Sequence, residues 1–486
     1  MPEAVLNPAA ENKFLADLAA QKLGVAVTAE EAKEIFDLAK TVETLKNAAS
    51  RETDPAAWTA YGRAKISLTD RIEALKPDGR TWNQLLLEAV NIPRTIMSTM
   101  DLSAPLVQGW GLEGSGAWRD AFVRMHSYLM HEESYQELRG WMVGHPLFDR
   151  IDKSGLSLTE LGQKLSAREE TIQSTLVEKA FEYGITRTTG IPNLPRASNR
   201  AFTGFINYAR FKTMVDMIEA ARLAGMDVSE GSQLLKDFAA TINNFSGRGQ
   251  VGGARVENLI TGLNAVFFAP RKTVGTIQMF NPANMLNPRI NKMARVKATK
   301  MLMGSVLYTG AIIGLARAMG ADVDLDPRSS DFLQIGIGNT KFDVTGGNAT
   351  YLRFMARMAT NQMVNSNDEL RELGEGYRAT TRADLLLSFL RNKLAPVAAF
   401  IADALYGKDP IGRPFSLTDE MRDKLMPMTV NDFIDFAQND PGNYAAVLPM
   451  LTAVYGVSLR PPIPGFNPAK RDVWGQPKGT VYNDDV

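Results

Sequence analysis

Cysteine is absent from this chain of 486 residues, and histidine occurs only three times, at His126, His131 and His145. The lack of thiols excludes disulfide bonds, thiolate metal sites and cysteine nucleophiles. His131-Glu132 resembles the start of a zinc-protease motif, but Tyr135 stands where the second histidine is required. His126 and His131 are five residues apart, so they do not share one face of a helix. We therefore predict no metal site and no bound cofactor.

A G-x-G-x-x-G pattern is formed by Gly109, Gly111 and Gly114. In dinucleotide-binding proteins this fingerprint follows a β-strand and opens a helix. Here no strand is legible before the first glycine, and the bulky Trp110 lies inside the turn. We interpret this segment as a flexible loop rather than a nucleotide site.

Two acidic patterns are also incomplete. Asp322, Asp324 and Asp326 match the opening of a calcium loop, but Pro327 occupies the position of the glycine that the loop needs. We interpret the three carboxylates as the polar entry to the hairpin described below. Glu133 has a faint likeness to the catalytic acid of lytic transglycosylases, but the sugar-binding motifs are missing. The sequence thus predicts no catalytic residue, and we do not expect an enzyme.

Charge is balanced, with 54 basic residues against 54 acidic ones. Nucleic acid is therefore not the partner of the whole surface, and any DNA contact must come from a local patch. Zero net charge also removes one safeguard against self-association, which favours a homo-oligomer. The N-terminal residues are mixed in charge and lack an apolar core, so we expect neither a secretory signal nor a transit peptide. Synthesis in a host cytoplasm is the expectation.

Helical signals dominate the sequence. Five S/T-x-x-D/E capping boxes predict helix starts at Thr28, Ser157, Ser166, Ser416 and Thr429. Apolar residues recur at helical spacing and predict one buried helix face, at Phe211, Met214, Val215 and Ile218. We predict a mainly α fold: a multi-helix body with one small β-hairpin and an extended C-terminal tail.

The hairpin is expected at about residues 333–344, where apolar and polar residues alternate on both sides of Gly338-Asn339. A single hairpin needs something to pack on, and the flanking helices are the expected support. The tail follows from the proline- and glycine-rich composition of the last residues. Four regions result: a charged helical region at 1–92, a central helical body at 93–288, the basic–apolar segment with hairpin and helices at 289–460, and the tail at 461–486.

The basic–apolar segment is the most informative stretch. Five cations come with no intervening acid, and they are Arg289, Lys292, Arg295, Lys297 and Lys300. Roughly sixteen residues without a charge follow, at 301–316. Cations beside an apolar helix are typical of membrane-active segments, although a spanning helix normally needs about 20 residues. Two interpretations stay open: a helix in the protein core behind a solvated basic segment, or a helix that inserts into a membrane conditionally.

Glycines in the apolar run bear on both interpretations. Gly304, Gly310 and Gly314 permit close helix approach, and Gly310 with Gly314 has the spacing of packed membrane helices. Ile312 lies between them as part of the apolar surface. The five cations are the candidate contacts for lipid head groups or DNA phosphates. Away from a membrane, we expect the apolar helix to be packed within the protein or against a neighbouring subunit, because exposure of its apolar surface is costly.

Six short phrases, taken in order, carry a resemblance. They are DLSAPL at 101–106 with Gln108 and Gly109, NNFSGRG at 243–249, LNAVFFAPR at 263–271, LDPRSSDF at 325–332, RNKLAP at 391–396 and GKDPIG at 407–412. In this combination the chain, over roughly residues 95–460, resembles the large polyvalent-protein-associated modules of tailed-bacteriophage internal virion proteins. Such proteins travel with the genome and enter the host during DNA ejection. The longer relatives carry added enzyme domains, which are not expected here.

The resemblance implies an internal virion protein that oligomerises and helps form a conduit for genome delivery across the host envelope. Its implied partners are further copies of itself, portal, tail and ejection proteins, phage DNA and the host membrane. The implied location is the interior of the phage particle, followed by the host cell envelope. A purely structural virion component without membrane activity is the first alternative, and an enzyme acting on host wall or nucleic acid is the second.

Overall fold

The computed structural model places most of the central part of the chain, and a mainly helical architecture is confirmed. The described residues form fifteen α-helices and two small antiparallel sheets. The expected tail at 461–486 and the capping boxes that begin at Ser157, Ser166 and Ser416 lie wholly or partly outside them. The structure describes residues 27–51, 54–75, 102–159, 182–187, 193–249, 266–267, 269–338, 340–364, 369–375, 379–394, 396–407, 416, 428–439 and 455–460.

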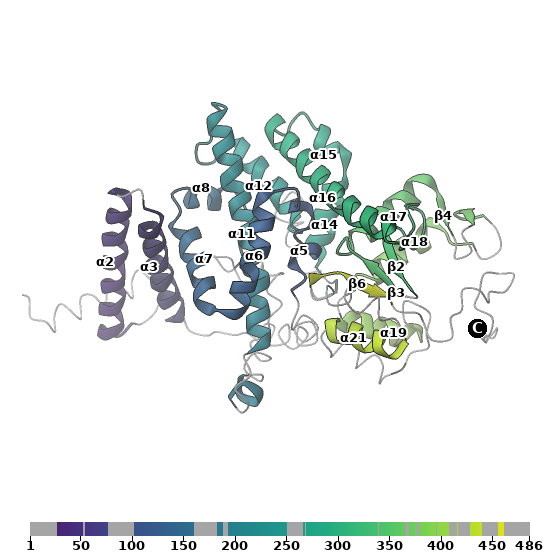
Figure 1. The fold of residues 1–486 in the computed structure, drawn as a ribbon. Coiled ribbons are helices and arrows are strands. Elements are labelled where there is room, and N and C mark those ends of the chain that lie inside the picture. Colours follow the sequence, from purple (N-terminus) through teal and green to yellow (C-terminus); the bar gives the residue numbers. More distant parts are fainter. Residues whose placement is uncertain are drawn as a thin grey trace, which may run out of the picture.

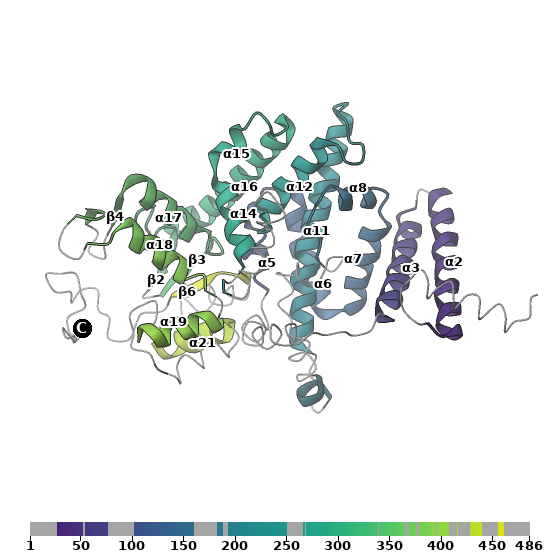
Figure 2. The same cartoon turned by 180° about the vertical axis from the view of Figure 1, so that it is seen from behind.

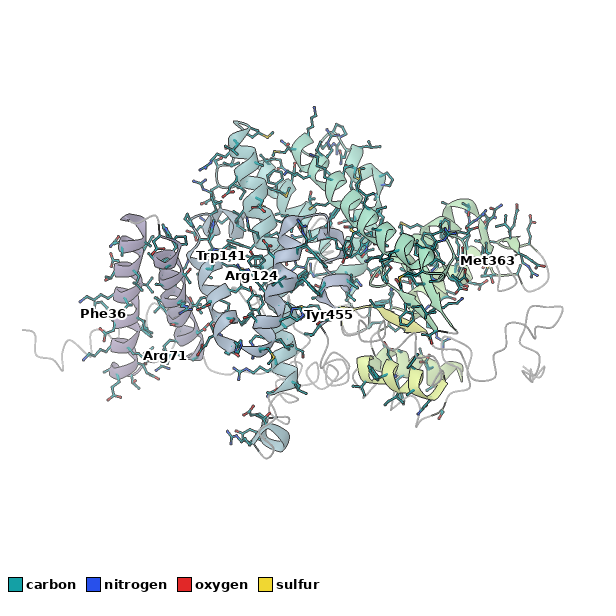
Figure 3. The ribbon with its side chains drawn as sticks, viewed as in Figure 1. Phe36, Arg71, Arg124, Trp141, Met363 and Tyr455 are labelled. Atoms are coloured by element: carbon teal, nitrogen blue, oxygen red, sulfur yellow. The ribbon has the colours of Figure 1, made fainter. Side chains whose placement is uncertain are left out.

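An antiparallel pair of helices forms one end of the molecule, α2 (Ala29–Arg51) and α3 (Pro55–Ala74) (Figure 1). The predicted capping box starts α2: the Glu31 amide donates to Thr28 Oγ1 at 3.3 Å, and the Thr28 amide donates to Glu31 Oε2 at 2.9 Å. Arg71, labelled in Figure 3 between the two helices, donates to Glu34 at 2.8 Å. Phe36 on the outer side of α2 is exposed.

Glycines attach this pair to the rest of the protein. α3 packs on α7 (Glu132–Gly144), and a Cβ built on Gly62 would lie 1.9 Å from the Gly140 carbonyl oxygen. A Cβ on Gly144 would lie 1.8 Å from the Trp58 carbonyl oxygen. Only glycine fits at these positions, so Gly140 and Gly144 form a G-x-x-x-G contact that lets the two helix backbones meet.

The helical body fills the centre, around the long helix α11 (Leu194–Leu223) (Figures 1 and 2). The predicted stripe on α11 is confirmed, because Phe211, Met214, Val215 and Ile218 are all buried in the larger core cluster. The other elements of the body are α5 (Ala104–Val107), η1 (Trp110–Leu112), α6 (Gly116–Met130), α8 (Phe148–Lys153), η3 (Glu182–Thr186), α12 (Gln233–Phe245), α14 (Pro270–Phe280) and α15 (Pro282–Leu286).

The predicted hairpin forms, and it is the centre of a larger sheet. Strands β2 (Gln334–Ile337) and β3 (Thr340–Asp343) pair antiparallel, with Ile335 opposite Phe342 in the core. Leu333 has a left-handed backbone (φ 60°), so the strand begins one residue later than the alternation predicts. β1 (Asp322–Val323) and β6 (Ser458–Arg460) flank the hairpin in the order β1-β2-β3-β6. The support for the hairpin thus includes a strand from more than 100 residues later in the chain.

Further helices cover the sheet from two sides (Figures 1 and 2). α17 (Asn348–Thr360) and α18 (Arg382–Arg391) lie on one side, and α19 (Pro396–Tyr406) and α21 (Met428–Asn439) lie on the other. Thr429 lies inside α21 rather than before it, so the helix start predicted at Thr429 is wrong. The small second sheet pairs β4 (Gln362–Val364) with β5 (Leu370–Glu372).

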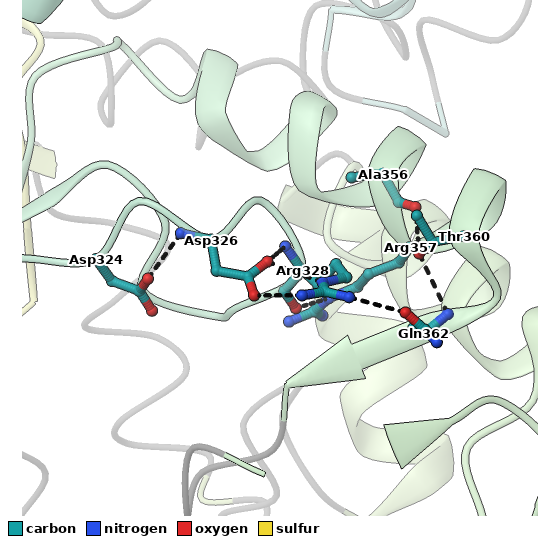
Figure 4. A network of polar contacts seen from close by, with 7 residues as sticks. All are labelled: Asp324, Asp326, Arg328, Ala356, Arg357, Thr360 and Gln362. Atoms are coloured by element: carbon teal, nitrogen blue, oxygen red, sulfur yellow. Dashed lines mark hydrogen bonds and ion pairs between the residues drawn. The ribbon is translucent and has the colours of Figure 1, made fainter. Parts of the chain in front are cut away.

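The aspartate pattern ahead of the hairpin forms a polar network rather than an open ligand loop (Figure 4). The Asp326 amide donates to Asp324 Oδ1 at 2.8 Å. The Arg328 guanidinium donates to both oxygens of Asp326, at 3.0 and 2.8 Å, which lowers the pKa of that carboxyl. Arg328 also donates to Gln362 at 2.8 Å and so connects the loop to β4. The network agrees with a polar entry to the hairpin.

Candidate functional site

Helix α16 (Lys292–Ala318) contains almost the whole basic–apolar segment in one element. Asn291 caps it, accepting a hydrogen bond from the Met293 amide at 2.8 Å. The Asn291 amide in turn donates to Asp237 Oδ2 at 2.7 Å, which attaches the start of α16 to α12. The predicted boundary between the central body and the basic–apolar region, after residue 288, therefore lies just before a helix whose first turn is bonded to α12.

The five predicted cations gather at the N-terminal end of α16. Arg289, Lys292 and Lys300 are exposed, whereas Arg295 and Lys297 are half-buried. Arg295 donates through Nε to the Ile290 carbonyl at 3.2 Å. Within the described part of the chain, none of the five lies within ion-pair distance of a carboxylate, and the first turn of α16 contains no acid.

Cations at a helix N-terminus oppose the helix macrodipole. Lys292 lies in the first turn, where an acid would stabilise the helix by about 0.3–1 kcal/mol and a cation destabilises it. The basic run is therefore not there to stabilise α16. It leaves positive charge, reinforced by the positive end of the helix dipole, available to an anionic partner.

One stripe of α16 is buried, and its polar members attach it to η1. Ser305 Oγ donates to the Trp110 carbonyl at 2.6 Å, and Trp110 Nε1 donates to Thr309 Oγ1 at 2.9 Å. A Cβ built on Gly304 would lie 2.3 Å from Gly114 Cα, so the two backbones touch. The full stripe is Ala294, Ala298, Met301, Ser305, Thr309 and Ile313.

The glycine pattern at 109–114 is thus a packing motif, and the interpretation as a flexible loop is wrong. Trp110, Gly111 and Leu112 are buried in a 3₁₀ turn, and Gly111 approaches the backbone of Phe245. The pattern needs glycine because α16 and the end of α12 both approach the turn backbone too closely for a side chain.

The opposite face of α16 is open, so this face is not packed within the chain, and packing against a neighbouring subunit stays a prediction. Met303 is 58% exposed and Leu307 69% exposed, and Val296 and Val306 also face outward. By length and composition α16 could cross a membrane, yet only 22% of its apolar 18-residue stretch is buried in the protein. Such low burial is unlike the core helix of the first interpretation.

The three glycines of α16 differ in their surroundings. Gly304 is in contact with Gly114, so its close approach is used within the chain. Around Gly310 and Gly314 nothing lies within 4 Å of a built Cβ, so both stay open for an external partner. Ile312 is half-buried and faces a cavity beside the helix.

That cavity measures about 830 Å³ and lies between the C-terminal half of α16, the helical body and the four-stranded sheet. The larger core cluster contains the first half of α16, and the smaller cluster contains Ile313 with the sheet residues. The cavity lies between elements of the two clusters. Its lining is almost entirely apolar, with Leu315 and Met319 from α16, Trp118 and Phe122 from α6, and Ile335 from β2.

Tyr455 supplies a polar group in the cavity wall, at the junction of body and sheet (Figure 3). Its hydroxyl lies 2.9 Å from His126 Nε2, and His126 Nδ1 lies 3.0 Å from the Phe122 carbonyl oxygen. Because a carbonyl only accepts, Nδ1 must carry a proton. In a neutral imidazole Nε2 then accepts from the Tyr455 hydroxyl, which leaves the phenol oxygen as an acceptor toward the cavity.

Glu113, next to the Gly114 contact, is a buried acid. The side chain is 9% exposed, and neither carboxyl oxygen has a hydrogen-bond partner in the described part of the chain. Burial raises the pKa of Glu113 to about 9, so the carboxyl is protonated at neutral pH. An unpaired acid beneath α16 is a local cost to stability, and sequence reasoning gave no signal for it.

The histidines and Glu133 do not come together. His131 precedes α7 as its cap residue, Glu133 is exposed in the first turn of that helix, and His126 is paired with Tyr455. Burial lowers the pKa of His145, which packs against Trp141 and Phe211. Among the described residues there is no group of three or more His, Asp or Glu that could hold a metal ion.

In comparisons with known proteins, no family model, no curated protein and no solved structure matches the chain.

Proposed function

We propose that the protein is an internal virion protein of a tailed bacteriophage that takes part in genome ejection. It oligomerises and helps form a conduit across the host envelope, with α16 as the element that meets the membrane. The proposal rests on the sequence resemblance over residues 95–460 and on the surface of α16. The single observation that carries it is that one helix combines cations that have no acidic partner among the described residues with an open apolar face along its length.

Charge is the first support. Five cations with no acidic partner in the described residues suit an anionic surface, and the helix dipole adds to their field. In the particle the same cations can contact DNA phosphates, and at the host they can contact anionic head groups. Both contacts are salt-dependent.

The open face is the second support. Because Met303 and Leu307 face outward, α16 can lie in the plane of a membrane surface while its buried stripe stays attached to the body. Insertion across the bilayer requires release from η1 and from the sheet. Gly310 and Gly314 on the open face would then allow helices from several copies to approach closely.

A structural virion component that never touches lipid is the alternative, and the buried stripe of α16 favours it. Ser305 and Thr309 fix the helix to η1, and the helix joins both core clusters, as a structural helix does. Fractionation of infected cells separates the two functions. The ejection function predicts the protein in host membranes after infection, whereas the structural function predicts it in particles only.

Vesicle binding tests the membrane step directly. Full-length protein is sedimented with vesicles of phosphatidylcholine and phosphatidylglycerol, and Lys292, Lys297 and Lys300 are changed together to Glu. Each cation contributes on the order of 1 kcal/mol, so we expect at least a roughly 100-fold loss of affinity. Arg295 is kept because it bonds the Ile290 carbonyl.

The matched control reverses three exposed lysines of α2, Lys33, Lys40 and Lys46, which changes the net charge equally. This control should bind as the parent protein does, and parent binding should weaken as salt is raised. Equal binding by the α16 variant and the parent would show that these cations do not dock the protein on lipid.

A further inference from the structure

The cavity beside α16 is large enough for a small ligand, and its described wall is mainly apolar. Ligand pockets typically enclose about 300–1,000 Å³, and this one holds about 830 Å³. The cavity is open to solvent on one side, so water can enter it, but the described wall offers that water few polar partners and an apolar guest would displace it. Most of the wall is aliphatic and aromatic. The occupant must therefore be apolar over most of its length.

The Tyr455 hydroxyl in the wall limits which chemical group of the occupant can lie inside the cavity. When the Tyr455 hydroxyl donates its hydrogen bond to Nε2 of a neutral His126, the phenol oxygen can only accept further hydrogen bonds. An acceptor does not recognise a carboxylate or a phosphate, because these groups also only accept. Among the described lining residues the other phenol, Tyr308, is exposed at the rim, so an amphiphile bound here keeps its head at or outside the rim.

The rim of the cavity points to where such an occupant comes from. Leu315 and Met319 line the cavity and are also 64% and 80% exposed, and Tyr308 lines it and is exposed as well. A pocket for a water-soluble ligand is entered through a polar rim, but here the apolar surface continues from the outside of α16 into the cavity. While α16 lies on a bilayer, a hydrocarbon chain can pass from the bilayer along this apolar surface into the cavity.

We propose that the cavity between α16 and the β1-β2-β3-β6 sheet takes one acyl chain of a bilayer lipid. This inference rests on the proposed function, because the lipid is supplied by the membrane that α16 meets. A chain in the cavity fills the space between the two core clusters. It also holds the C-terminal half of α16 at the membrane surface through apolar contact, which complements the charge contact at the other end of the helix.

Trp118 makes the proposal measurable, since it lines the cavity and stacks on Phe122 with ring centroids 5.5 Å apart. Full-length protein is mixed with anionic vesicles whose phosphatidylcholine carries bromine on one acyl chain, and tryptophan quenching is recorded. The difference between the parent and Trp118→Phe isolates the Trp118 signal. We expect more than half of that signal to be quenched at saturation.

A space-filling variant and a matched control test whether the acyl chain lies in the cavity. Ala316→Phe places a ring in the cavity, and Ala311→Phe places the same ring on the exposed face of the same helix. Ala316→Phe should reduce Trp118 quenching at least tenfold while vesicle sedimentation persists, and Ala311→Phe should leave quenching unchanged. Equal quenching in all three proteins overturns the proposal.

A second measurement needs neither a vesicle nor a space-filling variant, and the Trp118 signal is again the difference between the parent and Trp118→Phe. Monomeric dibromostearate, below its micelle concentration, should quench Trp118 saturably with one molecule per chain. A linear, unsaturable response overturns the acyl site even where Ala316→Phe fails to fold. This assay also separates the two proposals: a failure of the acyl site with intact, lysine-dependent vesicle binding leaves the proposed function standing. If vesicle binding does not depend on the three lysines but dibromostearate binding is saturable, the acyl site stands and the proposed membrane function fails.

Discussion

Trp110 donates through its indole Nε1 to Thr309 Oγ1 at 2.9 Å, across 199 positions of sequence. Ser305, one turn earlier on α16, donates to the carbonyl of the same tryptophan at 2.6 Å. Two side chains that lower the apolar character of the segment are therefore the ones that hold it to the body. Because they fix one face of α16 inward, the opposite face with Leu307 is fixed outward. The orientation of the open face follows from this pair of hydrogen bonds.

Thr309→Val should destabilise the protein by about 1–3 kcal/mol, because it leaves the buried Trp110 N–H without an acceptor. The measurement is the free energy of unfolding in urea. Thr299→Val on the same helix is the control, since the Thr299 hydroxyl donates only to the Arg295 carbonyl one turn earlier in α16. If the two variants lose the same stability, the Trp110–Thr309 bond is not what holds α16 in place.

The glycines of α16 should respond oppositely to substitution. Gly304→Ala should lower the melting temperature, because a Cβ would lie 2.3 Å from Gly114 Cα. Gly310→Ala and Gly314→Ala meet open space and should each stabilise the helix by about 0.5–1 kcal/mol. Thermal unfolding followed by circular dichroism measures all three.

Bulkier changes at the open pair test self-association separately from folding. Gly310→Leu with Gly314→Leu should keep or raise the melting temperature but reduce leakage of dye from anionic vesicles, because close approach of helices from different copies is lost. Unchanged leakage would mean that the G-x-x-x-G spacing plays no part in assembly. Loss of folding in this variant would contradict the open surroundings of the two glycines.

Local patterns predicted well wherever neighbours in sequence decide the structure. The Thr28–Glu31 box, the buried stripe on α11 and the hairpin all depend on contacts within a few residues, or on one-sided burial of a periodic face. The capping box at Thr381 and Asp384, which forms with both reciprocal bonds, has the same signature and was overlooked. It could have been found from sequence.

Contacts between distant segments could not be predicted in this way. The spacing of Gly310 and Gly314 is the same as that of Gly140 and Gly144, yet only the second pair is packed in the described structure, against Gly62 of α3. Which glycines meet a partner depends on where other helices lie, and no local pattern contains that. For the same reason β6, which completes the sheet, gave no signal as a partner of the hairpin.

Catalysis offers a negative prediction. The purified protein should show no peptidoglycan, protease or nuclease activity, because the sequence has no intact catalytic motif and Glu133 is an exposed residue at the start of α7. Turbidity loss of cell walls, casein cleavage and plasmid nicking measure the three activities. Turnover that disappears in Glu133→Gln or His131→Ala, but persists in the neighbouring Glu137→Gln, would revive an enzymatic function.

Glu113 gives a prediction in pH. Its folded pKa of about 9 lies above the value of 4.5 for an exposed glutamate, so between these values the folded state binds a proton that the unfolded state releases. Stability from this group is therefore complete below pH 4.5 and falls as pH rises toward 9, by at most about 1.4 kcal/mol per pH unit. Urea unfolding between pH 5 and 8 measures this slope.

Two substitutions separate the charge of Glu113 from its unpaired polar atoms. Glu113→Gln cannot ionise, so its stability curve should diverge upward from the parent's as pH rises, although its amide stays unpaired. Glu113→Met should lose the same pH dependence. Its free energy of unfolding should be higher by a further 1–3 kcal/mol, roughly, because the substitution removes the buried polar atoms as well. Parallel curves for the parent and Glu113→Gln would mean that the carboxyl is solvated or paired. The loss of slope requires an acid that is held neutral beneath α16, where raising the pH charges it and weakens the attachment of that helix.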